Sequence, residues 1–470
     1  MPHIAIKYAA IAHFKGGFMK TIGIIAEYNP FHNGHAYQIN EIRKRTHADY
    51  IVIAMSGDFV QRGTPAIVDK YARTRMALSC GADLVLELPT LWATASAEDF
   101  ALAGVTLFEK MGCVDGICFG AETDNLPLLS LLAEILTNEP ENYKKALSSY
   151  IKEGLNFPAA RAKALCDYLA TLPDCYSMEE IASIINEPNN ILAIEYLKAL
   201  IRRNSSITPY LIKREGAGYH DSNIYSATNT NLQSAGVSDA FSAPTASATA
   251  IRGILHSYEH KGSEHLTDSL SDAMPKAAQQ ILTDYLAKSP SLCADDFSQI
   301  LGYRLLTTTL ESLANICDCN DDIANRLYRN RESFYSYESF LTQNKSKDVT
   351  YTRMSRVLLH LLLGMDKEKE RTGKTCDYIP YLRVLGFGKK TRDCTPLLAA
   401  LKQTASVPLI TKLADAKKRL PAQALAMLED DIFAAALYEQ VKLQKQQQNP
   451  NTYQETAAAQ NEYTRGLVLL

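Results

Sequence analysis

The segment "TIGIIAEYNPFHNGHAYQI", residues 21–39, decides the fold of this chain. Its first six residues are almost all apolar, as in a strand that is buried on both faces of a parallel sheet. From Gly34 onward, apolar residues recur at the spacing of an amphipathic helix. The segment therefore predicts a strand, a short loop and a helix, with His32 and His35 at the start of the helix.

The same alternation continues along the chain. Further strands are predicted at residues 50–57, 83–89, 115–122 and 207–215. Helices are predicted at residues 34–46, 68–82, 96–112 and 188–204, and a loop leading into a helix at 243–257. Short apolar runs that alternate with helices favour an α/β fold with a doubly wound parallel sheet. Such sheets bind ligands beyond the carboxyl ends of their strands.

We expect the chain to have four parts. Residues 1–18 are expected to be a non-native extension before a natural start at Met19, because Lys15–Gly17 could be encoded by the purine-rich run of a ribosome-binding site. The catalytic domain should cover 19–258, with a helical insertion at about 123–185. A mainly helical C-terminal region is expected over 259–440, and a flexible Gln/Asn-rich tail over 441–470.

The composition is that of a soluble globular protein, with 46% apolar and 21% charged residues. The net charge of −3 excludes a chain that is polybasic throughout. No apolar run approaches the roughly 20 residues that a membrane span needs. The ten cysteines are scattered without a CxxC pair, which favours free thiols in a reducing, cytoplasmic setting.

The two histidines suggest a site for a polyphosphate. The first turn of a helix offers free backbone N–H groups and a positive dipole end, and Gly34 lets an anion approach the backbone. Imidazoles there would be neutral when the site is empty, and a bound triphosphate would restore their charge. They could stabilise an in-line displacement at phosphorus. The alternatives are two surface histidines that cap a helix by chance, or a metal site, for which no third ligand is evident.

Several motifs together resemble a known family. They include "NPFHNGH", "MSGDFVQRGTPAIVDKYART", "GADLVLELP", "ICFGAE", "PNNILAIEYLKAL", "IKREGAGYHD" and "SATAIR". These are similar to the bacterial tRNA(Met) cytidine acetate ligases, within the HxGH nucleotidyltransferase superfamily. The resemblance implies a Rossmann-like catalytic domain, and a reaction of ATP, as its Mg²⁺ complex, with acetate to give acetyl-adenylate. The wobble cytidine of elongator tRNA(Met) would then be acetylated at N4. No membrane and no protein partner is implied.

The resemblance also assigns residues. His32 and His35 are implied to act on the phosphates as catalytic residues. The implied ATP contacts are Ile25, Ala26, Glu27, Tyr28, Asn29, Pro30, Phe31, His32, Asn33, Gly34, His35, Ala36, Tyr37, Gln38, Gly120, Asn189 and Arg214. Three of these have simpler alternatives: a turn glycine for Gly120, a helix N-cap for Asn189 and a solvated surface side chain for Arg214.

The "SATAIR" segment is similar to a second phosphate-binding motif of related nucleotidyltransferases. It implies phosphate contacts from Ser247 and Thr249 and a pyrophosphate contact from Arg252, with ordinary helix capping as the alternative. Asp58 stands where the family pattern leads us to expect Asn, so the role of that side chain is in question.

Residues 351–420 contain fifteen Lys and Arg against six Asp and Glu, a net charge of +9. A basic region on an otherwise acidic protein suggests a surface for RNA phosphates. We expect Arg383, Lys389, Lys390 and Arg392 to contact the tRNA, with a solvated helical face as the alternative. Two other functions also stay open: an adenylyltransferase for a small phosphorylated metabolite, and a non-catalytic nucleotide-sensing RNA-binding protein.

Overall fold

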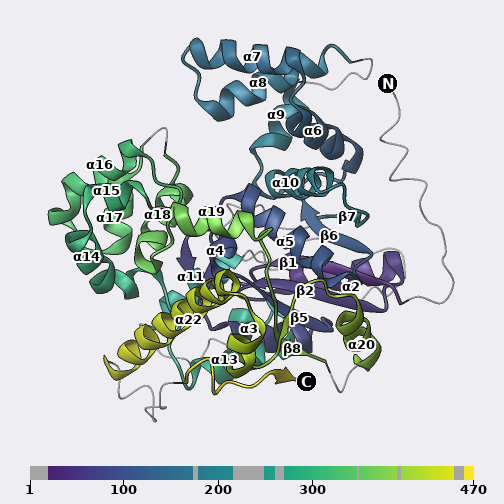
Figure 1. Cartoon of the computed structure of the whole chain (residues 1–470), viewed down its shortest axis with the longest axis vertical. Helices are drawn as coiled ribbons and strands as arrows, with labels where there is room; N and C mark the ends of the chain where they lie inside the picture. Colours follow the sequence, from purple (N-terminus) through teal and green to yellow (C-terminus); the bar gives the residue numbers. More distant parts are fainter. Residues whose placement is uncertain are drawn as a thin grey trace, which may run out of the picture.

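The computed structural model describes residues 19–172, 178–214, 248–259, 269–346, 349–388, 393–448 and 460–470. The expected extension, 1–18, lies outside these ranges. A large sheet forms the centre of the molecule (Figure 1). Its strand order is β10-β8-β5-β2-β1-β6-β7, with β9 paired with β8. Its strands are β1 (Thr21–Ala26), β2 (Tyr50–Ser56), β5 (Leu84–Leu88), β6 (Gly116–Ala121), β7 (Thr208–Lys213), β8 (Leu382–Phe387), β9 (Leu409–Ile410) and β10 (Val468–Leu469).

The N-terminal strands form the expected doubly wound arrangement. β1 pairs in parallel with β2 on one side and with β6 on the other. The chain runs outward from β1 through β2 to β5, and then returns to build β6 and β7 on the opposite side. The strand order therefore reverses between β1 and β6, which is where such sheets bind their ligands. The loop that contains His32 begins directly after β1.

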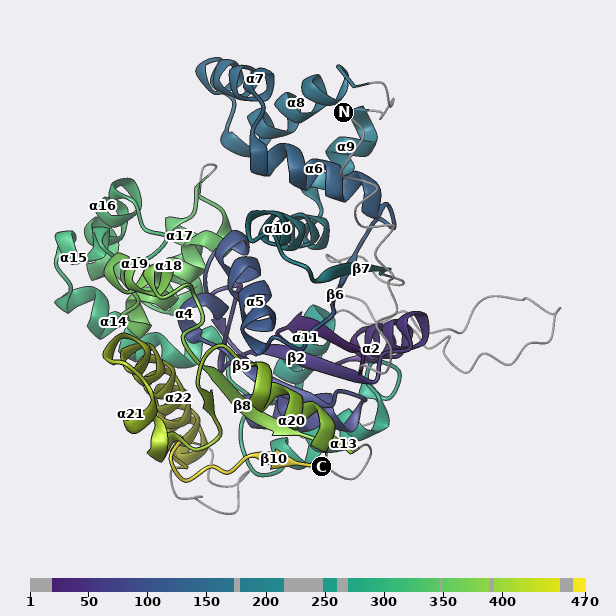
Figure 2. The same cartoon turned by 45° about the vertical axis from the view of Figure 1, so that its right-hand side comes forward.

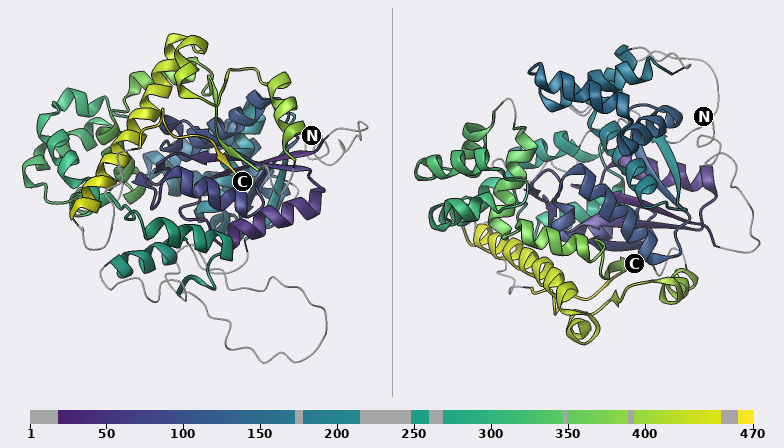
Figure 3. Two further views of the ribbon diagram at one scale, coloured as in Figure 1. Left: turned by 90° about the horizontal axis from the view of Figure 1, so that it is seen from below. Right: turned by 45° about the horizontal axis from the view of Figure 1, so that its top comes forward.

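Helices cover both faces of this sheet (Figures 1 and 3). Successive residues of β2 alternate between two hydrophobic clusters, with Val52 in one and Ile53 in the other, because strand side chains point to opposite faces. The helices around these strands are α2 (Asn33–Thr46), α3 (Lys70–Ser79), α4 (Thr90–Ala93), α5 (Ala97–Met111), α10 (Pro188–Arg202), α11 (Ala248–Glu259) and α13 (Lys276–Leu286).

The helical insertion lies at the top of the molecule in Figure 2, and most of the C-terminal helices lie at its left. The insertion contains α6 (Leu126–Asn138), α7 (Glu141–Lys152), α8 (Phe157–Leu169) and α9 (Met178–Asn186). The C-terminal helices are α14 (Ser298–Thr307), α15 (Leu310–Ala314), α16 (Asp321–Asn330), α17 (Tyr337–Asn344), α18 (Tyr351–Leu363), α19 (Lys367–Thr375), α20 (Thr395–Thr404), α21 (Ala416–Arg419) and α22 (Ala422–Gln448). None of the helices in the described ranges is long and apolar enough to cross a membrane.

The C-terminal region is not a purely helical unit. β8 pairs antiparallel with β5, and β10 pairs in parallel with β8. The expected flexible tail is wrong for residues 441–448, which continue α22, and for 460–470, which fold back onto the sheet edge. The Gln-rich composition suggested mobility, but Val441 and Gln446 are buried against the rest of the protein.

Candidate active site

A cavity of about 230 Å³ lies at the carboxyl ends of β1, β6 and β7. It is the place that the strand order predicts for a ligand. The residues sharing its walls are Ile25, Ala26, Glu27, Tyr28, Asn29, His32, Gly34, His35, Tyr37, Gln38, Gln61, Arg62, Phe100, Phe119, Gly120, Asn189, Leu192, Tyr196, Ile212, Lys213, Arg214, Ala248, Thr249 and Arg252.

Two histidines form the N-terminal cap of α2. His32 Nδ1 accepts the backbone N–H of Gly34 at 3.1 Å, and His35 Nδ1 accepts the backbone N–H of His32 at 3.2 Å. The rings stack with their centroids 3.7 Å apart. Because both Nδ1 atoms accept hydrogen bonds, each neutral ring has its proton on Nε2. Both side chains can therefore donate an Nε2–H to a ligand in the cavity without becoming charged.

The electrostatic setting keeps these rings neutral. Burial, and after it the positive charges of Arg214 and Arg252, lower the pKa of His32 to about 3. Burial also holds the pKa of His35 well below its ordinary value, and the nearby His32 and Arg214 act in the same direction to a smaller extent. Protonating His32 would place a second N–H on Nδ1, facing the Gly34 N–H that it now accepts. Both rings are thus neutral without a ligand, as expected from the sequence, and their recharging by a bound triphosphate stays a prediction.

Two arginines bring positive charge to the same cavity. Arg214 directly follows β7, and its backbone N–H donates to Ala121 O at 2.8 Å. Arg252, on α11, donates from Nη1 to Asn29 O at 2.8 Å and from Nη2 to Thr249 Oγ1 at 3.0 Å. These contacts fix the Arg252 guanidinium against the histidine loop. Ser247 lies outside the described residues.

The end of β6 is clamped to the start of α10. Asn189 Nδ2 donates to the carboxylate of Glu122, and Asn190 Oδ1 accepts the backbone N–H groups of Glu122 and Thr123 at 3.0 and 3.2 Å. Asn189 is not the N-cap of α10, because that position is Glu187. A Cβ on Gly120 would lie 3.3 Å from Arg214 Cγ, so the small residue allows this arginine to pack closely.

Fifteen of the expected ATP and phosphate residues line the cavity: Ile25, Ala26, Glu27, Tyr28, Asn29, His32, Gly34, His35, Tyr37, Gln38, Gly120, Asn189, Arg214, Thr249 and Arg252. Pro30, Phe31, Asn33 and Ala36 are not among the lining residues. Phe31 and Ala36 are buried in the core, and Asn33 Nδ2 donates to Asp272 O at 2.9 Å.

Sequence reasoning missed the contribution of the loop between β2 and α3. This loop contains the short strands β3 (Phe59–Val60) and β4 (Thr64–Pro65). Gln61 and Arg62 lie between them and line the cavity, and the Gln61 backbone N–H donates to Glu27 Oε1 at 3.0 Å. The "SGDFVQRGTPAIVDK" segment was a family signal, but nothing local indicated which of its side chains reach the site.

A buried arginine, Arg73, holds the start of this loop through hydrogen bonds to backbone carbonyl oxygens. Arg73 donates to the carbonyl oxygens of Glu27 and Ser56 at 2.7 and 3.0 Å, and also to that of Gly57. It therefore joins the chain leaving β1 to the chain leaving β2. Asp58 is buried and accepts the Lys70 backbone N–H at 2.8 Å. Burial raises the pKa of Asp58 to about 6, against the opposing charge of Lys70.

The expected tRNA contact of Arg383 is wrong. Arg383 lies on β8, is only 4% exposed, and forms ion pairs with Glu87 and Glu462. Its guanidinium is therefore paired with buried carboxylates and is not accessible to an RNA phosphate. Lys389, Lys390 and Arg392 lie outside the described residues, so their contact with RNA stays a prediction.

The comparisons with known proteins agree with this geometry. Residues 19–453 match the model of the HIGH Nucleotidyl Transferase family. A protein named tRNA(Met) cytidine acetate ligase from Thermoanaerobacter sp. (strain X514) is 39% identical over 422 residues, covering 89% of this chain and 95% of the relative. A protein of the same name from Acetivibrio thermocellus is 38% identical over 421 residues, covering 89% of this chain and 94% of the relative.

Two crystal structures of Thermotoga maritima TmcAL are also similar. The apo form superimposes with a TM-score of 0.82 and 28% identity, covering 96% of this chain and 100% of that chain. The form bound with alpha-thio ATP has a TM-score of 0.81 and 27% identity, covering 96% and 99% of the two chains. Given the matching fold, the histidine-capped cavity and these similarities, this chain belongs to the HIGH nucleotidyl transferase family and, within it, to the tRNA(Met) cytidine acetate ligases.

Proposed function

We propose that this protein is an ATP-dependent ligase that uses acetate to form N4-acetylcytidine at the wobble position of elongator tRNA(Met). The main supporting observation is the pair of neutral imidazole donors beside two guanidinium groups, in a cavity where the strand order reverses. The names of the relatives specify tRNA(Met), cytidine and acetate. One related structure holds an ATP analogue.

In the first step, a carboxylate oxygen of acetate attacks the α-phosphorus of ATP. The bond from phosphorus to the β-phosphate oxygen breaks, and pyrophosphate leaves with that electron pair. Negative charge spreads over the phosphate oxygens in the transition state. The Nε2–H groups of His32 and His35 donate to these oxygens from fixed positions, because the capping hydrogen bonds hold both rings. Arg252 neutralises the departing pyrophosphate.

In the second step, the N4 amine of cytidine attacks the acetyl carbonyl carbon. The bond between that carbon and the phosphate oxygen breaks, AMP leaves with the electron pair, and N4 releases a proton. This step requires the acceptor cytidine to reach the same cavity from outside. Since both ATP and tRNA are cytoplasmic, we place the protein in the cytoplasm.

We expect ATP to enter as its Mg²⁺ complex, with the metal held by phosphate oxygens and water. Over the described ranges, no group of three or more His, Cys, Asp or Glu is placed to hold a metal ion. Glu27 lines the cavity, but its carboxylate already accepts the Gln61 backbone N–H. We propose the metal as part of the ATP substrate, held by its phosphate oxygens.

One pair of assays tests the proposal. Acetate-dependent exchange of pyrophosphate into ATP should occur without tRNA, and N4-acetylcytidine should appear by mass spectrometry when elongator tRNA(Met) is added. Exchange that needs a phosphorylated metabolite would support a metabolite adenylyltransferase. ATP binding without any exchange would support a nucleotide-sensing RNA-binding protein, and either result would overturn the ligase proposal.

A further inference from the structure

A second, larger cavity adjoins the one that holds the histidines. Its volume is about 970 Å³, against about 230 Å³ for the first. The two cavities share a wall made of Gln61, Arg62, Leu192, Thr249 and Arg252. A ligand in the larger cavity would therefore lie directly beside the place where acetyl-adenylate forms. Acetate, with two carbons, would leave nearly all of this volume empty.

The walls of the larger cavity come from segments that are distant in sequence. Arg161 lies on α8 of the helical insertion, and Tyr351 is the first residue of α18 in the C-terminal region. The helical insertion lies at the top of both views, and most of the C-terminal helices lie at the left (Figures 1 and 2). The loop with Gln61 and Arg62 forms the side nearest the first cavity.

The charge of this cavity is strongly biased. Its described lining includes the cationic residues Arg62, Arg161, Arg252 and Arg356, together with His256, and a single carboxylate, Glu338. Arg356 is paired with Asp318 at 2.7 Å, and Glu338 accepts a hydrogen bond from the Tyr351 hydroxyl. The carboxylate is thus already satisfied by a neutral group, and the described lining holds four arginines against this one carboxylate. A polyanion is the ligand that fits such a wall.

The cavity also offers an aromatic surface. Tyr351 is 42% exposed, although its hydroxyl is held by Glu338. A partly exposed ring that is fixed at one end is suited to stacking on an unpaired base. Helix α18, which begins at Tyr351, is also joined to the first cavity. Its Ser355 hydroxyl donates to Gly63 O at 2.8 Å, and Gly63 directly follows Gln61 and Arg62, which line that cavity.

We propose that this larger cavity binds unpaired nucleotides of the RNA substrate, with phosphates along Arg62 and Arg161 and a base stacked on Tyr351. The inference rests on the proposed function and adds the path by which the acceptor cytidine reaches the adenylate. It places RNA recognition between the helical insertion and α18, and not at Arg383, which is buried in ion pairs on β8.

The test compares two cavity variants with matched controls. Arg161→Gln and Tyr351→Leu should each raise the KM for tRNA by roughly tenfold, the range expected for one lost phosphate contact or base stack. Arg161→Gln should also flatten the log–log salt dependence of RNA binding by about 0.7, the value for one phosphate contact to a single strand. Tyr351→Phe keeps the ring and should restore the KM. Lys145→Gln, on α7 and 72% exposed, and Tyr335→Leu, 88% exposed, lie outside the cavity and should change neither value.

Acetate-dependent pyrophosphate exchange is measured on every variant, because it needs no RNA. Equal losses of exchange and acetylation in Arg161→Gln and Tyr351→Leu, or a tRNA KM within twofold of the controls, would overturn the inference. Binding of an anticodon stem-loop RNA, followed by fluorescence anisotropy, keeps the test independent of catalysis. If the wild type shows no pyrophosphate exchange but the cavity variants still bind the stem-loop RNA more weakly than the wild type does, the proposed function is wrong. The RNA-binding site is then still supported. A cavity that instead holds a protein segment predicts unchanged RNA affinity throughout.

Discussion

The imidazole rings of His32 and His35 stack at 3.7 Å between centroids, and each ring accepts a backbone N–H at the start of the same helix. The two residues thus have a structural task and, under the proposed mechanism, a chemical one as well. As caps they satisfy N–H groups that the helix leaves open. As neutral rings they keep their Nε2–H groups for the substrate.

The two tasks can be separated by substitution at His32. His32→Asn should preserve the cap, because Asn is a favoured N-cap residue, while exchange activity falls by at least about 10²-fold. His32→Ala should lose the same activity and also about 1 kcal/mol of unfolding free energy. Urea denaturation and pyrophosphate exchange on both variants check this. Near-normal exchange in His32→Asn would rule out the phosphate role.

The neutral state of His32 predicts a specific NMR titration. With its pKa lowered to about 3 by burial, the ring should stay neutral from pH 8 to about pH 4. Its ¹⁵N signals should show the Nε2–H tautomer over this range, assigned by their loss in His32→Asn. Because the folded pKa is below the ordinary value of about 6.5, the unfolded chain takes up a proton first. The contribution of His32 to stability is therefore present above about pH 6.5 and is lost as the pH falls toward 3. A titration midpoint near 6.5 would contradict this.

Gly63 should be intolerant of a side chain. It has φ +81, and a Cβ there would lie 2.4 Å from the Arg356 backbone nitrogen and 2.5 Å from the Ser355 carbonyl carbon. Gly63→Ala should therefore cost more than the roughly 1 kcal/mol of backbone strain alone, and should lower acetylation by moving the loop away from α18. Gly154→Ala is the matched control, since it has φ +91 and nothing within 4 Å. Equal destabilisation in the two variants, measured by urea denaturation, would show that the contact with α18 is unimportant.

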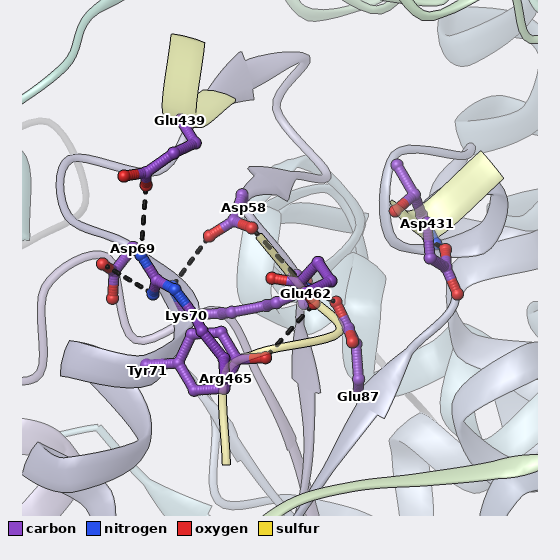
Figure 4. Close-up of polar contacts among 12 residues, drawn as sticks. Asp58, Asp69, Lys70, Tyr71, Glu87, Asp431, Glu439, Glu462 and Arg465 are labelled. Carbon is purple, nitrogen blue, oxygen red and sulfur yellow. Dashed lines mark hydrogen bonds and ion pairs between the residues drawn. The ribbon is translucent and has the colours of Figure 1, made fainter. Parts of the chain in front are cut away.

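Glu462 should stabilise the fold through buried ion pairs. Its carboxylate lies 2.9 Å from Lys70 Nζ and also pairs with Arg383, beside Glu87 (Figure 4 shows the Lys70, Glu87 and Glu462 side chains). Removing one partner of such a group leaves buried charge without compensation, so Glu462→Gln should lose about 3–5 kcal/mol.

The pH dependence of that loss gives a second check. Burial alone would raise the pKa of Glu462, but Lys70 and Arg383 outweigh it and lower the pKa to about 2. Since the folded pKa is below the ordinary value of about 4.3, the stabilisation is present above that pH and is lost as the pH falls toward 2. The difference in unfolding free energy between wild type and Glu462→Gln should shrink over this range. A difference that does not vary with pH would contradict the ion-pair role.

The basic residues near β8 should divide into two classes. Arg383→Gln should lower stability, exchange and acetylation together, because Arg383 is buried in ion pairs. The triple change of Lys389, Lys390 and Arg392 to Gln should leave exchange intact and weaken tRNA binding, if these residues meet phosphates. Thermal unfolding and both half-reactions on the two proteins make the comparison. A triple variant that binds tRNA normally would remove this segment from the RNA surface.

The sequence by itself determined the elements that depend on local pattern. The apolar run before His32, the capping position and the helical spacing after Gly34 were sufficient to place the histidines at the carboxyl edge of a parallel sheet. The motif resemblance then gave the family, which the comparisons confirm. These features are encoded within a few residues of one another.

Only the tertiary structure decided which distant side chains meet. Arg383 was read as a surface cation, yet β8 adds to the sheet edge and places it against Glu87 and Glu462. Gln61 reaches the cavity because Arg73 and α18 hold its loop. A charged residue has the same pattern in sequence whether it faces water or a buried partner. Whether such a residue is buried depends on which segments the fold brings together. Burial removes its charge from water, and only partner residues on those segments can offset that free-energy cost.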